Sequence, residues 1–121
     1  MTEQSLKTIL KMNDLTKAGD LKWSTWRIPI DSLTGLERLL GNAYMSTVKG
    51  KDIRIYKYES RHYYDEEQFD WVPHYRLEFI DNNGKASWEF PEELALADLY
   101  ESIQYRQSGA SEFFTDFLAD E

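Results

Sequence analysis

The chain has 121 residues, a formal net charge of −8, 41% hydrophobic and 15% aromatic residues, and no cysteine. This composition is not that of a wholly disordered chain, and the length suits a single domain, residues 1–121, with a buried core. The lack of cysteine excludes disulfides, thiolate catalysis and Cys-ligated zinc. No secretory signal is visible and no apolar run is long enough to span a bilayer. We therefore expect a cytoplasmic protein without a membrane segment.

Charge is distributed unevenly along the sequence. Residues 1–60 contain ten Lys/Arg and seven Asp/Glu, whereas residues 61–121 contain four Lys/Arg and fifteen Asp/Glu. A folded protein with this distribution can present an acidic face, which would favour basic partners over nucleic acid.

The first half of the chain predicts two helices and one short strand. Ser5 is a candidate N-cap for a helix that fades near Gly19. Residues 24–30 alternate as a short strand would, and Pro29 favours an edge position. Thr34 and Glu37 have the spacing of a capping box, which predicts a second helix ending at about residue 46.

The middle of the chain predicts a three-stranded antiparallel meander at about residues 52–90. Residues 52–60 and 72–80 alternate in the way half-buried strands do, with a polar loop expected at 61–70. The segment from Asp81 to Gly84 favours a tight turn, and a third strand follows it and ends near Phe90.

Two helices are expected at the C-terminal end. Pro91 with Glu92 and Glu93 is typical of a helix start, and Gly109 of a helix end. The buried stripe of this helix would be Leu96, Leu99, Tyr100 and Ile103. Ser111 would then cap a last helix that carries Phe113, Phe114, Phe117 and Leu118. The fold class is therefore α+β, a small antiparallel sheet packed with two helices from the N-terminal half and two C-terminal helices.

No catalytic motif is present. The chain has no nucleophile with an adjacent base, no phosphate-binding glycine loop and no metalloprotease motif, so we expect no enzyme, no cofactor and no metal site. His62 and His74 flank an acidic stretch and define one alternative, a metal-dependent enzyme. This alternative requires that the two histidines lie close together in the folded protein.

A second alternative is a nucleic-acid-binding module on the strand 52–60. Arg54 and Lys57 alternate there with Tyr56 and Tyr58, which could supply phosphate contacts and stacking rings. The acidity of the whole chain opposes this interpretation, because phosphate neutralisation supplies most non-specific affinity.

The leading hypothesis is a non-enzymatic acidic binding protein that blocks a basic, nucleic-acid-binding site on a partner protein. In general character the chain resembles the small acidic inhibitors, anti-CRISPR and anti-restriction proteins among them, that phages and mobile elements use against host nucleases, some of which mimic DNA. The carboxylates expected to contact the partner are Asp65, Glu66, Glu67, Asp70, Glu92, Glu93, Asp98, Glu101, Glu112 and Asp116, with Asp120 and Glu121 closing the chain. An equally simple interpretation is that they only keep the helices soluble.

The aromatic face of the last helix leaves three outcomes open. The helix could dock on the sheet of its own chain, which is the more common fate of a terminal amphipathic helix. It could also occupy a groove of a partner or pair with a second copy in a homodimer.

Overall fold

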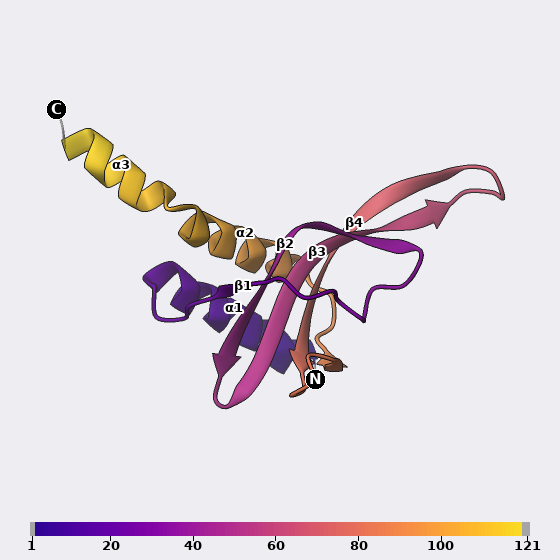
Figure 1. The fold of residues 1–121 in the computed structure, drawn as a ribbon, viewed down its shortest axis with the longest axis horizontal. Coiled ribbons are helices and arrows are strands. Elements are labelled where there is room, and N and C mark those ends of the chain that lie inside the picture. The colour runs from indigo at the N-terminus through magenta and orange to yellow at the C-terminus, as the bar shows by residue number, and fades with distance from the viewer. Residues whose placement is uncertain (1, 120–121) are drawn as a thin grey trace. The chain divides into compact units, whose positions relative to one another are not determined.

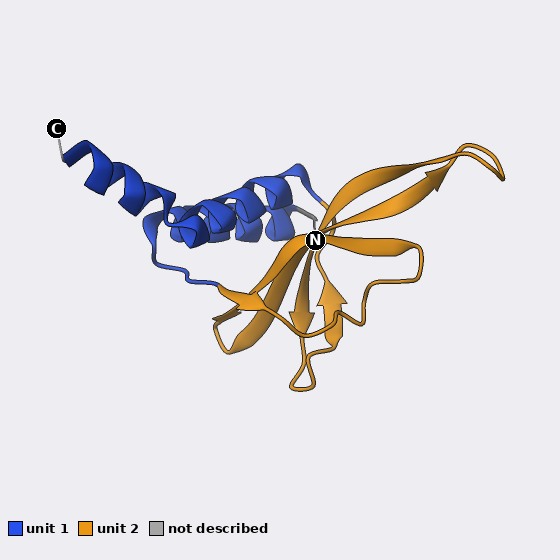
Figure 2. Cartoon of the chain, turned by 45° about the horizontal axis from the view of Figure 1, so that its top comes forward, with its two compact units in different colours: residues 1–23, 93–121 blue, residues 24–92 orange. Residues whose placement is uncertain are grey.

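A computed structural model of the protein describes residues 2–119, and these divide into two compact units. The helical unit comprises residues 1–23 and 93–121, and the sheet unit comprises residues 24–92 (Figure 2). The architecture is α+β, as predicted, with one antiparallel sheet and helices at both ends of the chain (Figure 1).

The sheet unit is a five-stranded antiparallel meander in the order β1-β2-β3-β4-β5. Its strands are β1 (Ser24–Trp26), β2 (Glu37–Val48), β3 (Lys51–Tyr63), β4 (Phe69–Ile80) and β5 (Ala86–Glu89). The predicted meander corresponds to β3, β4 and β5. The short strand predicted at residues 24–30 does lie at an edge, but β1 covers only Ser24–Trp26 and Pro29 lies outside it. The turn from Asp81 to Gly84 is confirmed, with Gly84 at φ +79° and its N–H donating to the Asp81 carbonyl at 3.0 Å.

The helix expected between Thr34 and residue 46 is wrong, because this segment forms strand β2. The capping contacts exist, since the Glu37 carboxylate accepts a hydrogen bond from the Thr34 N–H at 3.0 Å, but they stabilise a turn that leads into a strand. Gly41 has φ +68°, next to a shift in the pairing of β2 with β3. Lys49 and Gly50 then both have positive φ, the conformation of a two-residue hairpin turn. Pairing along β3 therefore overrides the local helix signal.

The polar loop expected at residues 61–70 is much shorter, because β3 and β4 continue through most of it. Their pairing extends from Asp52 opposite Ile80 to Tyr63 opposite Phe69, whereas β2 pairs with β3 only as far as Ser60. Residues 61–71 thus form a two-stranded arm beyond the rest of the sheet (Figure 1). Aromatic contacts stabilise it, including Tyr63 with Phe69 at a centroid distance of 5.3 Å.

The helical unit contains α1 (Thr2–Ala18), α2 (Leu94–Ser108) and α3 (Ala110–Ala119). Helix α1 starts before Ser5, so Ser5 is not its N-cap, and α3 starts one residue before Ser111. Helix α2 ends at Gly109, which has φ +74°, as expected for a left-handed C-cap. Its predicted stripe, Leu96, Leu99, Tyr100 and Ile103, is buried together with Ala95. Of the described helices, none is both long and apolar enough to cross a membrane.

The two faces of the sheet are buried differently. One face of β3 and β4 carries the apolar side chains Ile53, Ile55 and Leu77, all nearly inaccessible to solvent. The opposite face carries Tyr56 and Tyr58, which pack with Ala43 and with the partly buried Trp26, Ile30 and Leu33. Because Ile30 and Leu33 lie in the long β1–β2 connection, this connection covers the second face and places its polar residues over the sheet.

Candidate interaction surface

Two of the four acidic residues of the arm, Asp65 and Asp70, have structural roles at its tip. The Asp65 carboxylate accepts hydrogen bonds from the backbone N–H groups of Glu67 at 2.8 Å and Gln68 at 3.0 Å. The Tyr64 hydroxyl donates to the Asp70 carboxylate at 2.6 Å, and this hydrogen bond raises the pKa of Tyr64. The carboxylates of Glu66 and Glu67 are exposed and make no ion pair with the described residues, so they are the arm's available charges.

Glu92 belongs to the sheet unit, where it follows β5 and its carboxylate contacts β4. Its carboxylate lies 3.2 Å from Nδ1 of His74 and accepts a hydrogen bond from the Tyr75 N–H at 3.1 Å. Nε2 of His74 lies 3.0 Å from the Ser60 hydroxyl. This carboxylate is therefore already occupied by internal contacts.

The remaining predicted carboxylates lie in the helical unit. Glu93 precedes α2, Asp98 and Glu101 are exposed on α2, and Glu112 and Asp116 are exposed on α3. Asp120 and Glu121 lie outside the described residues. The predicted set is thus divided, with Asp65, Glu66, Glu67, Asp70 and Glu92 in the sheet unit and the others in the helical unit.

Helix α3 exposes its apolar face. Phe113, Phe114, Phe117 and Leu118 are 61%, 51%, 63% and 60% exposed, and none of the residues described in this helix is buried. The rings of Phe113 and Phe117 stack at a centroid distance of 5.7 Å, one turn apart. The structure therefore shows this face uncovered, and which surface covers it, the protein's own sheet, a partner or a second copy, stays a prediction. The helix continues past the end of α2 (Figure 1), and a short helix of this kind gains stability only when a partner covers its apolar face.

The side chains proposed for nucleic-acid contacts on β3 are largely buried. Arg54 and Tyr56 are 0% exposed and Tyr58 is 7% exposed. Arg54 donates through Nε to the Glu78 carboxylate at 2.8 Å and through Nη1 to the Gly84 carbonyl at 3.0 Å. Arg54, Tyr56 and Tyr58 therefore cannot reach a phosphate or stack on a base. Lys57, the fourth predicted side chain, is only partly buried, with its Nζ 5.6 Å from the ring centroid of Tyr75.

The three buried side chains belong instead to a polar network between the sheet and the β1–β2 connection. The Ser32 hydroxyl lies 2.7 Å from the Tyr56 hydroxyl and donates to the Glu78 carboxylate at 3.1 Å. Arg76 donates to the hydroxyl groups of Tyr56 and Tyr58, each at 3.0 Å. Burial raises the pKa of Tyr56. Burial alone lowers the pKa of Arg76, but its hydrogen bond and charge interaction with Tyr56 leave it above the usual value.

The sequence did not single out this network. Its visible signal was the alternation in β4, which places His74, Arg76 and Glu78 on one side of the strand and Tyr75, Leu77 and Phe79 on the other. The alternation alone does not indicate what lies over that side, which the β1–β2 connection covers in large part and where it supplies Ser32 as a partner.

The two histidines do not converge. His74 pairs with Tyr58 across the sheet and His62 pairs with Asp70, so they are separated by four residues along β3, roughly 13 Å at about 3.3 Å per residue. The ring of His62 packs edge-on against Tyr64. Within residues 2–119, no group of three or more histidine and carboxylate side chains is arranged to hold a metal ion.

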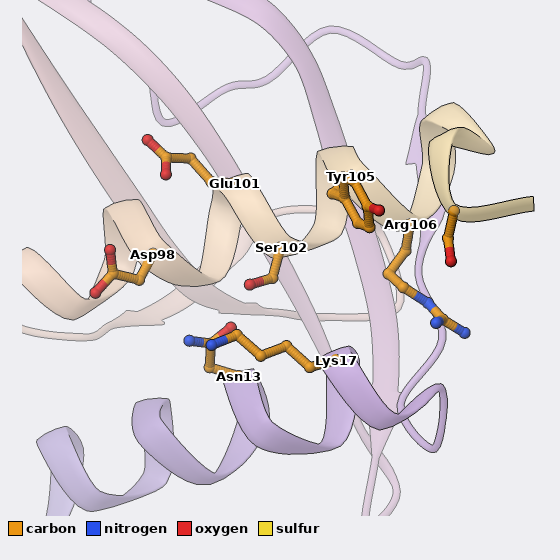
Figure 3. A pocket seen from close by; sticks show the side chains of 8 residues that line it. Asn13, Lys17, Asp98, Glu101, Ser102, Tyr105 and Arg106 are labelled. Atoms are coloured by element: carbon orange, nitrogen blue, oxygen red, sulfur yellow. The ribbon is translucent and has the colours of Figure 1, made fainter. Parts of the chain in front are cut away.

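The helical unit also contains a groove, lined by residues of α1 and α2 together with Ser111 of α3. Asp98 and Glu101 lie at one end of it and Arg106 near the other (Figure 3). Comparisons of the chain with protein-family models, with characterised proteins and with solved structures gave no significant match.

Proposed function

We propose that the protein is a non-enzymatic binding protein that occupies a basic, nucleic-acid-binding site on a partner protein through its acidic C-terminal region. The observation that carries the proposal is helix α3, on which an exposed aromatic stripe lies beside the exposed carboxylates Glu112 and Asp116. Aromatic side chains that fill apolar pockets supply most of the affinity of many interfaces, and surrounding charges supply steering and specificity.

The charge of this region supports a basic partner. Arg106 is the only basic residue in the sequence from residue 93 to residue 119, which contains Glu93, Asp98, Glu101, Glu112 and Asp116. Pairing α3 with its counterpart in a second copy would place like charges beside one another. A basic groove that normally holds phosphates would neutralise these carboxylates. We therefore propose a nuclease or a nucleoprotein as the class of partner.

The experiment is capture of partners by the full-length protein from a lysate of its source organism at low salt, followed by elution with salt. The captured protein must then lose its binding to double-stranded DNA or to RNA when the acidic protein is added. Binding that weakens steeply with ionic strength is expected, because exposed charges are screened by salt. A partner that still binds nucleic acid in the complex would contradict the proposal, as would self-association as the sole interaction in light scattering.

Two sets of variants separate specific contacts from bulk charge. The variant Glu112→Lys/Asp116→Lys and the variant Phe113→Ser/Phe117→Ser should each weaken binding at least about tenfold, which corresponds to roughly 1.4 kcal/mol. The matched control is Asp14→Lys/Asp20→Lys, because both residues are exposed in the same unit and the change in net charge is identical. Equal losses in the control and in the α3 charge variant would refute a specific role for α3.

A further inference from the structure

The groove in the helical unit has a volume of about 840 Å³, within the range typical of ligand pockets. Asn13 and Lys17 on α1 are four residues apart and therefore share one face of that helix. On α2, Asp98, Ser102 and Arg106 follow at the same spacing, with Glu101 beside them. Because α1 packs against α2, these two stripes line one space.

The charged side chains of the groove are not paired with each other. Asp98 and Glu101 lie at one end and Arg106 lies at the other, while the Lys17 side chain extends along α1 toward Asn13 (Figure 3). Among residues 2–119 no ion pair within 4.0 Å involves any of these four side chains, whereas Lys7 with Glu3 and Arg38 with Glu59 do form pairs. Both signs of charge are therefore available to a ligand that spans the groove.

A second, independent observation comes from Asn13. This residue is only 8% exposed, yet its side-chain oxygen Oδ1 has no hydrogen-bond partner. In Figure 3 its amide points into the space between α1 and α2. Leaving a buried acceptor unsatisfied costs about 1–3 kcal/mol, so native proteins rarely retain one without a use. An N–H donor of a ligand at the acidic end would satisfy it.

We propose that this groove binds a short peptide of about three residues through its charged termini. The N-terminal ammonium would lie against Asp98 and Glu101 and donate to Oδ1 of Asn13, and the C-terminal carboxylate would lie near Arg106. Along α2, Asp98 and Arg106 are eight residues apart, roughly 12 Å at about 1.5 Å per residue. An extended tripeptide spans about 10 Å, which matches this separation.

A peptide with two free termini fits these groups better than a ligand whose charges all have the same sign. A polyamine would satisfy only the acidic end, and an inorganic anion only the basic end. The hydroxyl of Ser102 and the ring of Tyr105, which line the groove between the two ends, suit a peptide backbone with its small side chains. The site needs neither the aromatic stripe of α3 nor a protein partner, so it is independent of the proposed function except that Asp98 and Glu101 serve both.

The test is a titration of the isotope-labelled protein with tri-alanine at low ionic strength, followed by ¹H–¹⁵N correlation spectra. Shifts are expected in the side-chain amide of Asn13 and the backbone amide of Ser102. Tri-alanine that is acetylated at its N-terminus and amidated at its C-terminus should bind at least about tenfold more weakly, because charge-assisted hydrogen bonds at both ends are lost. Spermidine, which carries only positive charge, and inorganic phosphate, which carries only negative charge, probe the acidic and the basic end separately.

Variants complete the test. Asn13→Leu, which removes the unpaired acceptor, and Asp98→Asn/Glu101→Gln, which changes only exposed groups, should each weaken tri-alanine binding about tenfold, whereas Asp20→Asn, an exposed change outside the groove lining, should leave it unchanged. If Asn13→Leu fails to fold, the exposed double variant decides. The proposal is overturned if tri-alanine shifts no groove resonance, if the blocked peptide or spermidine binds equally well, or if the double variant binds like the wild type. None of these outcomes depends on whether the protein blocks a basic site.

Discussion

The buried ion pair between Arg54 and Glu78 allows a quantitative test of how the sheet unit is held together. The side chains are 0% and 1% exposed, and Nε of Arg54 donates to the Glu78 carboxylate at 2.8 Å. Glu78→Gln keeps the shape but leaves the Arg54 charge buried, for which the usual cost is about 3–5 kcal/mol. Asp31 lies 3.8 Å from Arg54 but is half exposed, so it offsets only part of that charge. We therefore expect a loss of about 3 kcal/mol, at the lower end of this range.

Thermal and urea unfolding would measure this effect. At about 4 °C per kcal/mol for a chain of this size, the midpoint should fall by roughly 12 °C. The control is Glu59→Gln, whose partner Arg38 is largely exposed, and this change should cost no more than about 1 kcal/mol. Arg54→Met combined with Glu78→Leu should recover most of the loss, because no unpaired charge remains. Equal costs for Glu78→Gln and Glu59→Gln would refute the argument from burial.

Three further outcomes are expected, each measured by urea unfolding. Leu96→Ala should cost about 2–5 kcal/mol, because Leu96 is 0% exposed, whereas Leu94→Ala, at 91% exposure, should stay within about 0.5 kcal/mol; equal costs would contradict the assigned helix face. Gly84→Ala should cost at least about 1–2 kcal/mol, because φ is +79° and the added Cβ would lie 3.2 Å from the Trp26 ring; an unchanged midpoint would be incompatible with this turn. Backbone hydrogen bonds from the turn lower the pKa of Asp81 from 3.8, so its contribution to stability is present above that pH and is lost as pH falls through the folded-state pKa. The stability difference between wild type and Asp81→Asn should therefore shrink in acid, and a difference that does not change with pH would show that this charge is not stabilised by the fold.

Signals that depend on near neighbours predicted the structure well. The alternation in β3 and β4, the turn at Asp81 and the stripe of α2 all reflect contacts within a few residues or across a hairpin, and the structure confirms each of them. The Thr34–Glu37 pattern was also accurate as local chemistry, since the predicted side-chain contact exists. It failed as a helix signal because residues 37–48 gain more from pairing along β3 than from a helix interrupted at Gly41.

Features that depend on distant segments could not be predicted from the sequence. The alternation in β4 does not indicate that the β1–β2 connection lies over the polar face and places Ser32 there. The groove requires residues near position 13 to meet residues near position 102, and nothing in either helix alone indicates that. The exposure of Phe117 was not predicted either, because an amphipathic pattern specifies a face but not what covers it.

The order in which the chain is made has consequences for α1. The sheet unit is one continuous segment, residues 24–92, whereas α1 packs against α2 from the other end of the chain. During synthesis the meander can therefore form from neighbouring strands while α1 still lacks its helical partner. Bringing the two helices together closes a loop of more than seventy residues, an entropic cost of order 4 kcal/mol if that loop were unstructured. Prior folding of the meander removes much of that cost, so we expect the sheet to form first and docking of the chain's two ends to be the last and slowest step.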